Sequence, residues 1–344
     1  MSLIIHFLTN DGSPLGPTSK TIWGDHQRIG TGGAEIAMIT LCEEWTKAGH
    51  EVVLYNNPWE TNASPFEQRS IDSFRPEDDR DILIIFRSPN HRVGNAVGKK
   101  VWFSCDQLTM GNYVQLANSV DKIVCISPFH QKYFADTYRI MNTVCIDLPI
   151  RVDDYKIQRD IKVPYRLIFN SVPARGLDNA QRQYEIIKRE CPQASIVITS
   201  DYRLWGAGTG NEQFRLRWRN LEDVIFLGAV PRARLIQEQF KAQINLYPCN
   251  YDELFCVVVG ENQYAGAYPV TSSKGALATT NMGIVIDADA DDAKNDRLFV
   301  DAVLDLFADD NKLARLQNEV SQMAWTRFRP ETILKEWDEK VFNS

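Results

Sequence analysis

Short apolar runs alternate with helical segments along almost the whole chain, and this alternation constrains the fold more than any other feature. We expect strands at 3–8, 51–55, 81–86, 101–103, 123–126 and 143–146, and again at 165–169, 195–199, 244–247 and 283–286. Between the first two of them, Ala37, Leu41, Trp45 and Ala48 recur at helical spacing. Strands separated by helices predict an α/β fold with parallel sheets covered on both faces.

The alternation occurs twice, which predicts two domains. A length of 344 residues suits two domains of ordinary size. A polar stretch from Asp153 to Pro164 separates the two series and is expected to be the linker. We therefore place one domain at 1–155 and the other at 156–327, followed by a helix after Pro330.

Composition narrows the class of protein. The net charge of −7 argues against a broad basic face for nucleic acid or for anionic lipid. The seven cysteines are scattered and odd in number, which favours reduced thiols in a cytoplasmic protein. No apolar stretch approaches the ~18 residues of a membrane span, and the first residues, Met1–His6, form a strand rather than a signal peptide.

The segment after the strand at 244–247 predicts a binding site for an anionic ligand. It runs from a polar loop into an apolar segment, and Glu253 and Glu261 stand eight positions apart. A helix that starts near Phe255 would offer free N–H groups at Phe255, Cys256 and Val257 to a diphosphate. Glu261 would then lie about 8–9 Å along the helix axis, within reach of a ribose. Glu253 would face the other end of the ligand, so this geometry indicates a nucleotide-sugar site.

The same segment resembles the E-x7-E motif of retaining GT-B glycosyltransferases of family 4. That motif usually reads E-G-F-G-x-x-x-x-E-A-x-A-x-G-x-P-V-x-x-S. The matching positions are Glu253, Phe255, Glu261, Ala265, Pro269, Val270 and Ser272 or Ser273. Leu254 and Cys256 replace the two glycines, which places a side chain where glycine would allow close contact with a sugar.

The resemblance implies a fold and an activity. The fold would be GT-B, with two Rossmann-like domains that face each other across a cleft, and the helix at 328–344 would cross back to the N-terminal domain. The N-terminal domain would then bind the acceptor and the C-terminal one the nucleotide sugar. The activity would be metal-independent transfer from a nucleoside diphosphate sugar, a UDP- or GDP-sugar, to a glycan, lipid-linked or small-molecule acceptor. No separate cofactor is implied.

Gly32 and Gly33 lie at the start of the first helix, after a glycine-, proline- and serine-rich loop. A strand, a glycine-bearing loop, a helix and a second strand are typical of a dinucleotide- or nucleotide-sugar-binding unit. The family resemblance implies that this pair faces the donor phosphates. A simple role in capping the helix is the alternative.

The resemblance also assigns roles to polar residues at other strand ends. Arg175 takes the place of a lysine that neutralises the donor diphosphate, whereas Ser171 replaces its partner arginine. Asp106, after Cys105, takes the position of a contact near the anomeric carbon, although a capping aspartate beside a structural cysteine is an alternative. Arg87 and His91 are candidate acceptor ligands or solvated strand-end residues.

Three other functions remain open at this stage. One is a nucleotide-sugar epimerase, and another is a glucosyltransferase acting on DNA, which the acidic charge disfavours. The third is a catalytically idle GT-B module that binds a nucleotide or partner, which the replacements at Ser171, Cys105, Leu254 and Cys256 keep open. The pair Asp287 and Asp289 has the spacing of a metal-binding motif, but we expect it to lie in a solvated loop.

Overall fold

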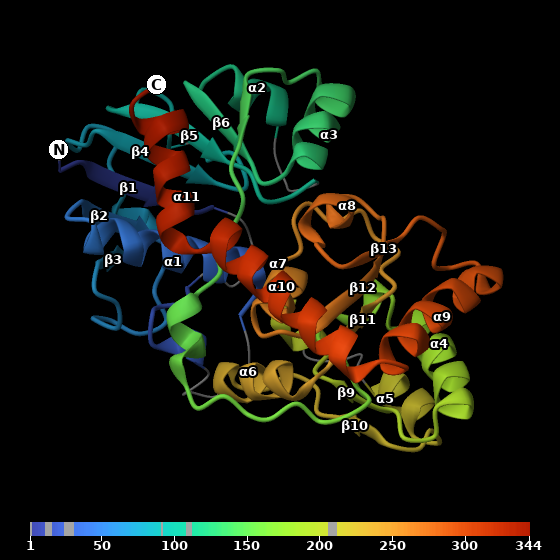
Figure 1. Cartoon of the computed structure of the whole chain (residues 1–344). Coiled ribbons are helices and arrows are strands. Elements are labelled where there is room, and N and C mark those ends of the chain that lie inside the picture. The colour runs from blue at the N-terminus through green and yellow to red at the C-terminus, as the bar shows by residue number, and fades with distance from the viewer. Residues whose placement is uncertain (1, 11–15, 24–30, 91, 108–111, 206–211) are drawn as a thin grey trace. The chain divides into compact units, whose positions relative to one another are not determined.

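The computed structural model describes residues 2–10, 16–23, 31–90, 92–107, 112–205 and 212–344, and the chain divides into two compact units (Figure 1). Of the described residues, unit 1 contains 2–10, 16–23, those within Thr31–Arg151, and Phe328–Ser344. Unit 2 contains Val152–Arg327. Each unit is an α/β structure built on a parallel sheet, as the alternation of apolar runs predicts.

Unit 1 has a seven-stranded parallel sheet in the order β3-β2-β1-β4-β5-β6-β7. Its strands are β1 (Ile4–Leu8), β2 (Glu51–Tyr55), β3 (Glu67–Arg69), β4 (Ile82–Phe86), β5 (Lys99–Phe103), β6 (Lys122–Cys125) and β7 (Thr143–Cys145). Strand β3 consists of charged and polar residues, so it has no apolar pattern and was not expected. The order of strands reverses between β1 and β4, where ligands of such sheets usually bind.

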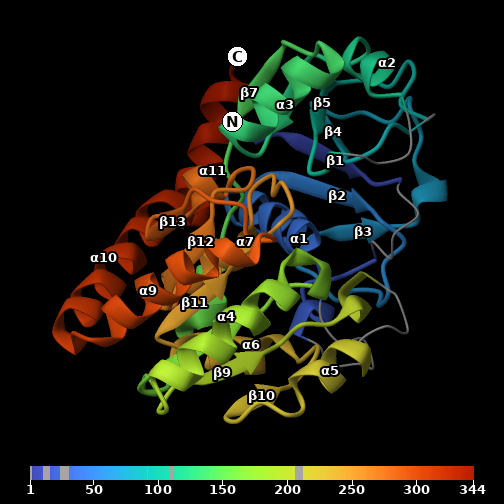
Figure 2. The same ribbon diagram turned by 90° about the vertical axis from the view of Figure 1, so that its right-hand side faces the viewer.

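Helices cover both faces of this sheet (Figure 2). They are α1 (Gly33–Lys47), α2 (Tyr113–Ala117), α3 (Pro128–Tyr138) and α11 (Pro330–Trp337), with short turns η1 (Thr21–Trp23), η2 (Ile71–Ser73) and η7 (Asp338–Phe342). Neighbouring strand residues point to opposite faces. Trp102 of β5 therefore packs on Tyr113 and Phe134, at ring distances of 5.0 and 5.3 Å, while Phe103 packs on Trp337 at 5.4 Å.

Helix α11 belongs to unit 1 although the chain reaches it from unit 2, which confirms the expected return of the last helix. The apolar stripe of α11 and the following η7, Ile333, Trp337 and Val341, is at most 1% exposed. The ring of Trp337 lies 5.2 Å from that of Trp45 in α1. The ammonium group of Lys99 donates to the main-chain oxygen of Val341 at 2.5 Å. The last helix is thus part of the core of unit 1.

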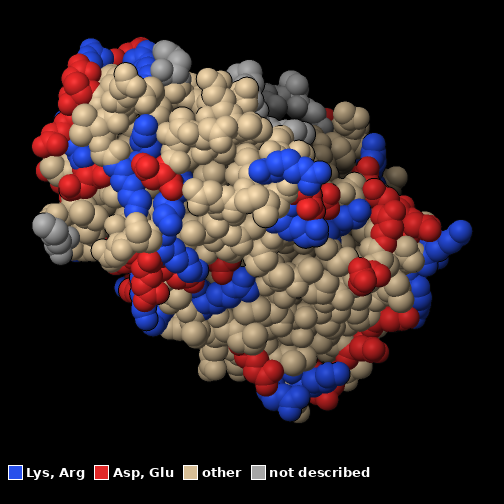
Figure 3. All heavy atoms as spheres, turned by 90° about the horizontal axis from the view of Figure 1, so that it is seen from above, with Lys and Arg blue, Asp and Glu red and all other residues tan. Residues whose placement is uncertain are grey.

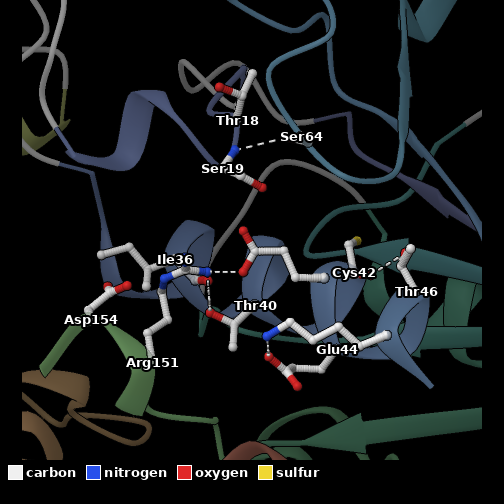
Figure 4. A network of polar contacts seen from close by, with 12 residues as sticks. Thr18, Ser19, Ile36, Thr40, Cys42, Glu44, Thr46, Ser64, Arg151 and Asp154 are labelled. Carbon is white, nitrogen blue, oxygen red and sulfur yellow. Dashed lines mark hydrogen bonds and ion pairs between the residues drawn. The ribbon is translucent and has the colours of Figure 1, made fainter. Parts of the chain in front are cut away.

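Arg151, the residue at which the chain leaves unit 1 for unit 2, is held by α1 (Figure 4). Its guanidinium donates to Oγ1 of Thr40 at 3.4 Å and pairs with the carboxylate of Glu43. Thr40 in turn donates to the carbonyl of Ile36, one turn earlier, at 2.7 Å. The chain therefore leaves unit 1 from a fixed point.

Unit 2 has a six-stranded parallel sheet in the order β10-β9-β8-β11-β12-β13. The strands are β8 (Arg166–Phe169), β9 (Ser195–Ile198), β10 (Val224–Phe226), β11 (Ile244–Tyr247), β12 (Tyr268–Ser272) and β13 (Ile284–Ile286). Here the strand order reverses between β8 and β11. The loops that follow these two strands carry Arg175 and Glu253.

The helices of unit 2 also lie on both faces of its sheet. They are α4 (Leu177–Glu190), α5 (Glu212–Trp218), α6 (Arg232–Lys241), α7 (Val257–Tyr264), α8 (Leu277–Thr280), α9 (Asp296–Phe307) and α10 (Asp310–Phe328), with short turns η3 (Val152–Lys156), η4 (Pro173–Arg175), η5 (Tyr202–Trp205) and η6 (Ala293–Asn295). Phe169 of β8 lies in the larger core with residues of α4 and α9. The neighbouring Ile168 lies in a small cluster on the opposite face.

The expected linker over 153–164 begins inside unit 2. Asp154 and Tyr155, in η3, are 3% and 7% exposed. The phenol of Tyr155 donates to Oε1 of Gln239 in α6 at 2.7 Å. The polar character of this stretch reflects buried polar contacts at its start as well as exposure further on.

Within the described residues, no helix is both long and apolar enough to cross a membrane. On the face shown in Figure 3, the described Lys and Arg side chains lie among Asp and Glu side chains. No broad field of one sign covers the described surface on that face.

Candidate functional site

The strand ends at the reversal point of unit 2 bring Arg175 and Glu253 together. Arg175 ends the turn η4 after β8, and Glu253 lies in the loop between β11 and α7. Nε of Arg175 is 3.5 Å from Oε1 of Glu253. Both side chains are largely buried, at 17% and 15% exposure. The two residues expected at the sugar and diphosphate ends of the ligand are therefore neighbours.

A buried tyrosine orients the carboxylate of Glu253. The hydroxyl of Tyr247, the last residue of β11, donates to Oε1 of Glu253 at 2.8 Å. Burial raises the pKa of Tyr247 well above its usual value, so the phenol stays protonated and can donate. Oγ of Ser171 lies 3.2 Å from the same phenolic oxygen. The position where the resemblance expects an arginine is thus occupied by a buried serine that supports Tyr247.

Arg175 is held by an aromatic face as well as by the carboxylate. Its guanidinium carbon lies 3.2 Å from the ring centroid of Tyr251. Burial acts to lower the pKa of Arg175, but Glu253 and the side chains of Tyr247 and Tyr251 outweigh it, and the pKa is raised. A cation in such a half-buried place attracts an anion more strongly than a solvated one.

Two glycines allow the loops of this site to pack closely. Gly176 has a φ of +96°, and a Cβ there would clash with the main chain of Pro248. Gly275 has a φ of +58°, and a Cβ there would clash with the main chain of Glu253. The N–H of Ala276 donates to the carbonyl of Glu253 at 2.6 Å. The backbone of Glu253 is therefore clamped by the turn after β12.

Helix α7 begins two residues later than expected. Cys256 is its N-cap and Val257 its first residue, while Phe255 is 2% exposed in the preceding loop. The N–H of Val259 already donates to the carbonyl of Cys256 at 3.1 Å, so the N–H groups of Val257 and Val258 are the ones that the helix N-terminus could offer to an anion. Glu261 then lies only about 6 Å along the axis, not 8–9 Å.

Cys256 adopts the left-handed conformation, with φ of +73°. This region favours glycine. Cys256 stands where the family motif has its second glycine, so the backbone keeps the glycine-like conformation although the residue has changed. Its side chain is 8% exposed, and burial raises the pKa of the thiol well above its usual value.

Glu261 is buried in the interior of unit 2 at 3% exposure. Nη2 of Arg232 donates to its Oε1 at 2.8 Å, and Nε2 of Gln239 lies 3.4 Å from its Oε2. The carboxylate assigned to a ribose is thus already held by a cation from α6.

A second charged group lies at the strand reversal of unit 1. Arg87, after β4, pairs with Glu35 of α1 at 2.8 Å and with Asp106, after β5, at 3.0 Å. Its φ of +61° places a non-glycine residue in the left-handed region. The strand ends therefore bring Arg87 and Asp106 together, as the parallel sheet predicts. His91 lies outside the described residues.

The expected glycine pair of unit 1 has a carboxylate beside it. Gly32 caps α1 and Gly33 is its first residue. The carboxylate of Glu35 lies so close to Gly32 that a Cβ there would meet its Oε2. Cys105 is 8% exposed, and burial raises the pKa of its thiol well above the usual value. It is therefore a buried thiol, with Asp106 as the more exposed neighbour.

Sequence reasoning did not identify the residues that hold these groups in place. Tyr247 and Tyr251 flank the motif, and an aromatic residue at a strand end was the available signal. Glu35, three residues after Gly32, and Arg232, just after Pro231, carried only a charge beside a helix start. Within the described part of the chain, no group of three or more His, Cys, Asp or Glu could hold a metal ion.

The sequence matches no family model and no curated protein. Several solved structures, in contrast, match along almost the full length. A glycosyltransferase from Rickettsia africae has a TM-score of 0.68 at 13% identity, over 99% of this chain and 98% of its own. Anabaena HepE in complex with UDP and glucose has a TM-score of 0.68 at 16% identity, over 98% and 99%.

TarM is also similar, with a TM-score of 0.60 at 13% identity. The match covers 76% of this chain and 55% of TarM, so the chain spans about half the length of that relative. At such identities the likeness concerns the fold. Two parallel-sheet, Rossmann-like units in one chain, matched to these enzymes over its full length, give this protein the GT-B fold of glycosyltransferases.

Proposed function

We propose that this protein is a retaining glycosyltransferase that moves a sugar from a nucleoside diphosphate sugar to a glycan, lipid-linked or small-molecule acceptor. The observation that carries the proposal is the pairing of Arg175 with Glu253 at the strand reversal of unit 2. Ligands of open parallel sheets bind at such points. The N-terminus of α7 follows directly in the chain.

The donor is assigned to unit 2, over residues 156–327. Arg175 and the main-chain N–H groups around Phe255, Cys256 and Val257 would neutralise the diphosphate. Glu261 would accept hydrogen bonds from the ribose. A UDP- or GDP-sugar is the proposed donor, and the structure of HepE with UDP and glucose supports a uridine nucleotide.

Glu253 is assigned to the sugar, and its Oε1 accepts a hydrogen bond from the hydroxyl of Tyr247 and pairs with Nε of Arg175. The bond between the anomeric carbon and the diphosphate oxygen breaks as Arg175 and the helix N–H groups stabilise the leaving group. The acceptor oxygen bonds to the same face of that carbon, and its proton passes to a diphosphate oxygen. Neither an enzyme nucleophile nor a metal ion takes part in this scheme.

The domain expected at 1–155 with the helix at 328–344, most of which lies in unit 1, is proposed to bind the acceptor. Asp106 is its candidate contact near the anomeric carbon, and the ion pair with Arg87 would orient it. Gly32 and Gly33 are assigned to the donor phosphates. Glu35 would have to turn away from Gly32 for that contact, because two anions in one place repel each other.

The position of Glu35 also favours a second candidate, an idle GT-B module that binds a nucleotide without turning over a sugar. A carboxylate against Gly32 occupies the place of a phosphate. Cys256 stands where the motif has glycine, and its side chain would reduce the space for the sugar of a donor. This replacement therefore also favours the idle module.

A panel of UDP-, GDP- and ADP-sugars separates the two candidates. Thermal shifts with the bare nucleotides identify the base, and initial rates with the matching sugars report turnover with and without an acceptor. Arg175→Ala should abolish the shift by the preferred nucleotide. Nucleotide binding without any transfer or hydrolysis would support the idle module, and the absence of any nucleotide binding would contradict both candidates.

A further inference from the structure

Unit 2 contains a buried group of three charged side chains, one of which is Glu261. Arg232 is the first residue of α6, Glu261 belongs to α7 and Asp154 to η3. All three residues are at most 4% exposed. They come from three separate elements, and each contributes a buried charge.

The guanidinium of Arg232 bridges the two carboxylates. Its Nη2 donates to Oε1 of Glu261 at 2.8 Å, and its Nε donates to Oδ2 of Asp154. Burial acts to lower the pKa of Arg232, but Glu261 and Asp154 outweigh it and the pKa is raised. The planar guanidinium therefore has a fixed orientation, and it transmits that orientation to Glu261.

The two oxygens of Glu261 are not equally satisfied. Oε1 has the short hydrogen bond from Arg232, whereas the donor nearest to Oε2 is Nε2 of Gln239 at 3.4 Å. Gln239 is itself held by the phenol of Tyr155 at 2.7 Å, which limits its approach. A carboxylate can accept about four hydrogen bonds. Of the two oxygens of the buried Glu261, Oε2 is thus the more weakly bound.

A vicinal diol supplies the two O–H donors that such an oxygen lacks. We propose that Arg232 is a positioning residue for a ribonucleoside donor, since it holds Glu261 so that Oε2 accepts from the ribose hydroxyls. This inference rests on the proposed function and adds to it that the site requires a ribose rather than a deoxyribose. Asp154 acts indirectly, because its carboxylate holds the guanidinium of Arg232.

A second buried cation in the same region gives a matched comparison. The ammonium of Lys162 donates to the carbonyls of Ala242 and Ala265, at the ends of α6 and α7, at 2.6 and 3.1 Å. Burial lowers the pKa of Lys162 well below its usual value. Lys162 joins the same two helices as Arg232, but through main-chain oxygens and without a carboxylate. Its role is structural.

The test compares Arg232→Met, Arg232→Lys and Lys162→Met with the wild type. Calorimetry measures the affinity for the preferred bare nucleoside diphosphate and for its 2′-deoxy form, and thermal melting measures stability. The wild type should prefer the ribose form by about ten- to a hundredfold, the ratio expected for a hydrogen bond to a charged group. Arg232→Met should lose this preference, and Arg232→Lys should reduce it. Lys162→Met should lower the melting temperature and keep the preference.

Three results would overturn the inference. One is an Arg232→Met variant that melts earlier but keeps the full ribose preference, because Arg232 would then be only structural. Another is a wild type that binds both forms equally. The third result applies if Arg232→Met does not fold: it is an Arg232→Lys variant that prefers the ribose form as strongly as the wild type does. A wild type that binds no nucleoside diphosphate at all would contradict the proposed function itself.

Discussion

The phenolic oxygen of Tyr247 lies 2.8 Å from Oε1 of Glu253, and this hydrogen bond joins the last residue of a buried strand to the first carboxylate of the motif. The phenol is fully buried and stays protonated, because burial raises its pKa well above the usual value. The same oxygen of Glu253 also lies 3.5 Å from Nε of Arg175. Its carboxylate is oriented before any ligand binds.

Tyr247→Phe should lower turnover and leave the affinity for the bare nucleoside diphosphate unchanged. Removing the hydroxyl deprives Glu253 of a hydrogen bond worth about 1.5 kcal/mol, so we expect roughly a tenfold lower kcat. Tyr184→Phe is the control, since the hydroxyl of Tyr184 donates to the main-chain carbonyl of Glu222 at 2.8 Å. Equal losses of turnover in both variants would show that the effect is on stability alone.

Replacing each of the two glutamates of the motif should impair a different measurement, binding in one case and turnover in the other. Glu261→Ala should weaken the bare diphosphate and the full donor alike, by about ten- to a hundredfold for one hydrogen bond to a charged group. Glu253→Ala should leave the bare diphosphate almost unaffected and depress donor turnover. Calorimetry beside initial rates checks both. Wild-type binding of the diphosphate by both variants would remove the ribose role of Glu261.

The left-handed backbone at Cys256 predicts that glycine is more stable than alanine at this position, the reverse of the usual order. Glycine normally costs about 0.5–1 kcal/mol relative to alanine, but the left-handed region costs a side chain about 1–2 kcal/mol. Cys256→Gly should therefore be more stable than Cys256→Ala by about 1 kcal/mol. Urea denaturation measures the difference. In the control pair at Cys125, within β6, alanine should be the more stable residue, and the same order at both sites would contradict the strain.

Stability should fall in acid partly because of His130. Burial lowers its pKa to about 3, and its Nδ1 accepts from the N–H of Ile126 at 3.2 Å. The unfolded chain binds a proton near pH 6.5, so the contribution is present above that pH. It is lost as pH falls toward 3, at about 1.4 kcal/mol per pH unit.

His130→Asn keeps an acceptor for Ile126 and should flatten the slope of unfolding free energy between about pH 6 and 4. His50→Asn is the matched control. The ring of His50 accepts from the N–H of Leu3 at 3.0 Å, but it is only partly buried. Its replacement should change the slope less. An unchanged slope in His130→Asn would mean that this histidine does not control the acid response.

Donor binding should survive excess EDTA, because the proposed neutralising groups are Arg175 and the N-terminus of α7. Titration of the preferred nucleoside diphosphate, with and without chelator, measures this directly. Loss of binding in EDTA that magnesium or manganese restores would contradict the metal-free scheme.

Much of the fold was predictable from local patterns. The run Ile244–Tyr247 is a strand with those bounds, and the stripe of Ile333, Trp337 and Val341 is buried as its spacing predicts. Strand β3 was not predictable, because Glu67–Arg69 is a run of charged and polar residues without an apolar alternation. The start of α7 was misplaced by two residues, because Cys256 takes a conformation that its residue type does not indicate.

The sequence alone indicated the two alternating series and most of their strands, and it placed Glu253, Glu261 and Arg175 in one motif-bearing unit, because apolar spacing and loop chemistry are local properties of the chain. Only the tertiary structure decided which charges meet. Arg232 reaches Asp154 across 78 positions and Glu261 across 29, and Arg87 joins Glu35 to Asp106. Such partners depend on how sheets and helices pack, and a buried charge is stable only where that packing brings an opposite charge to it.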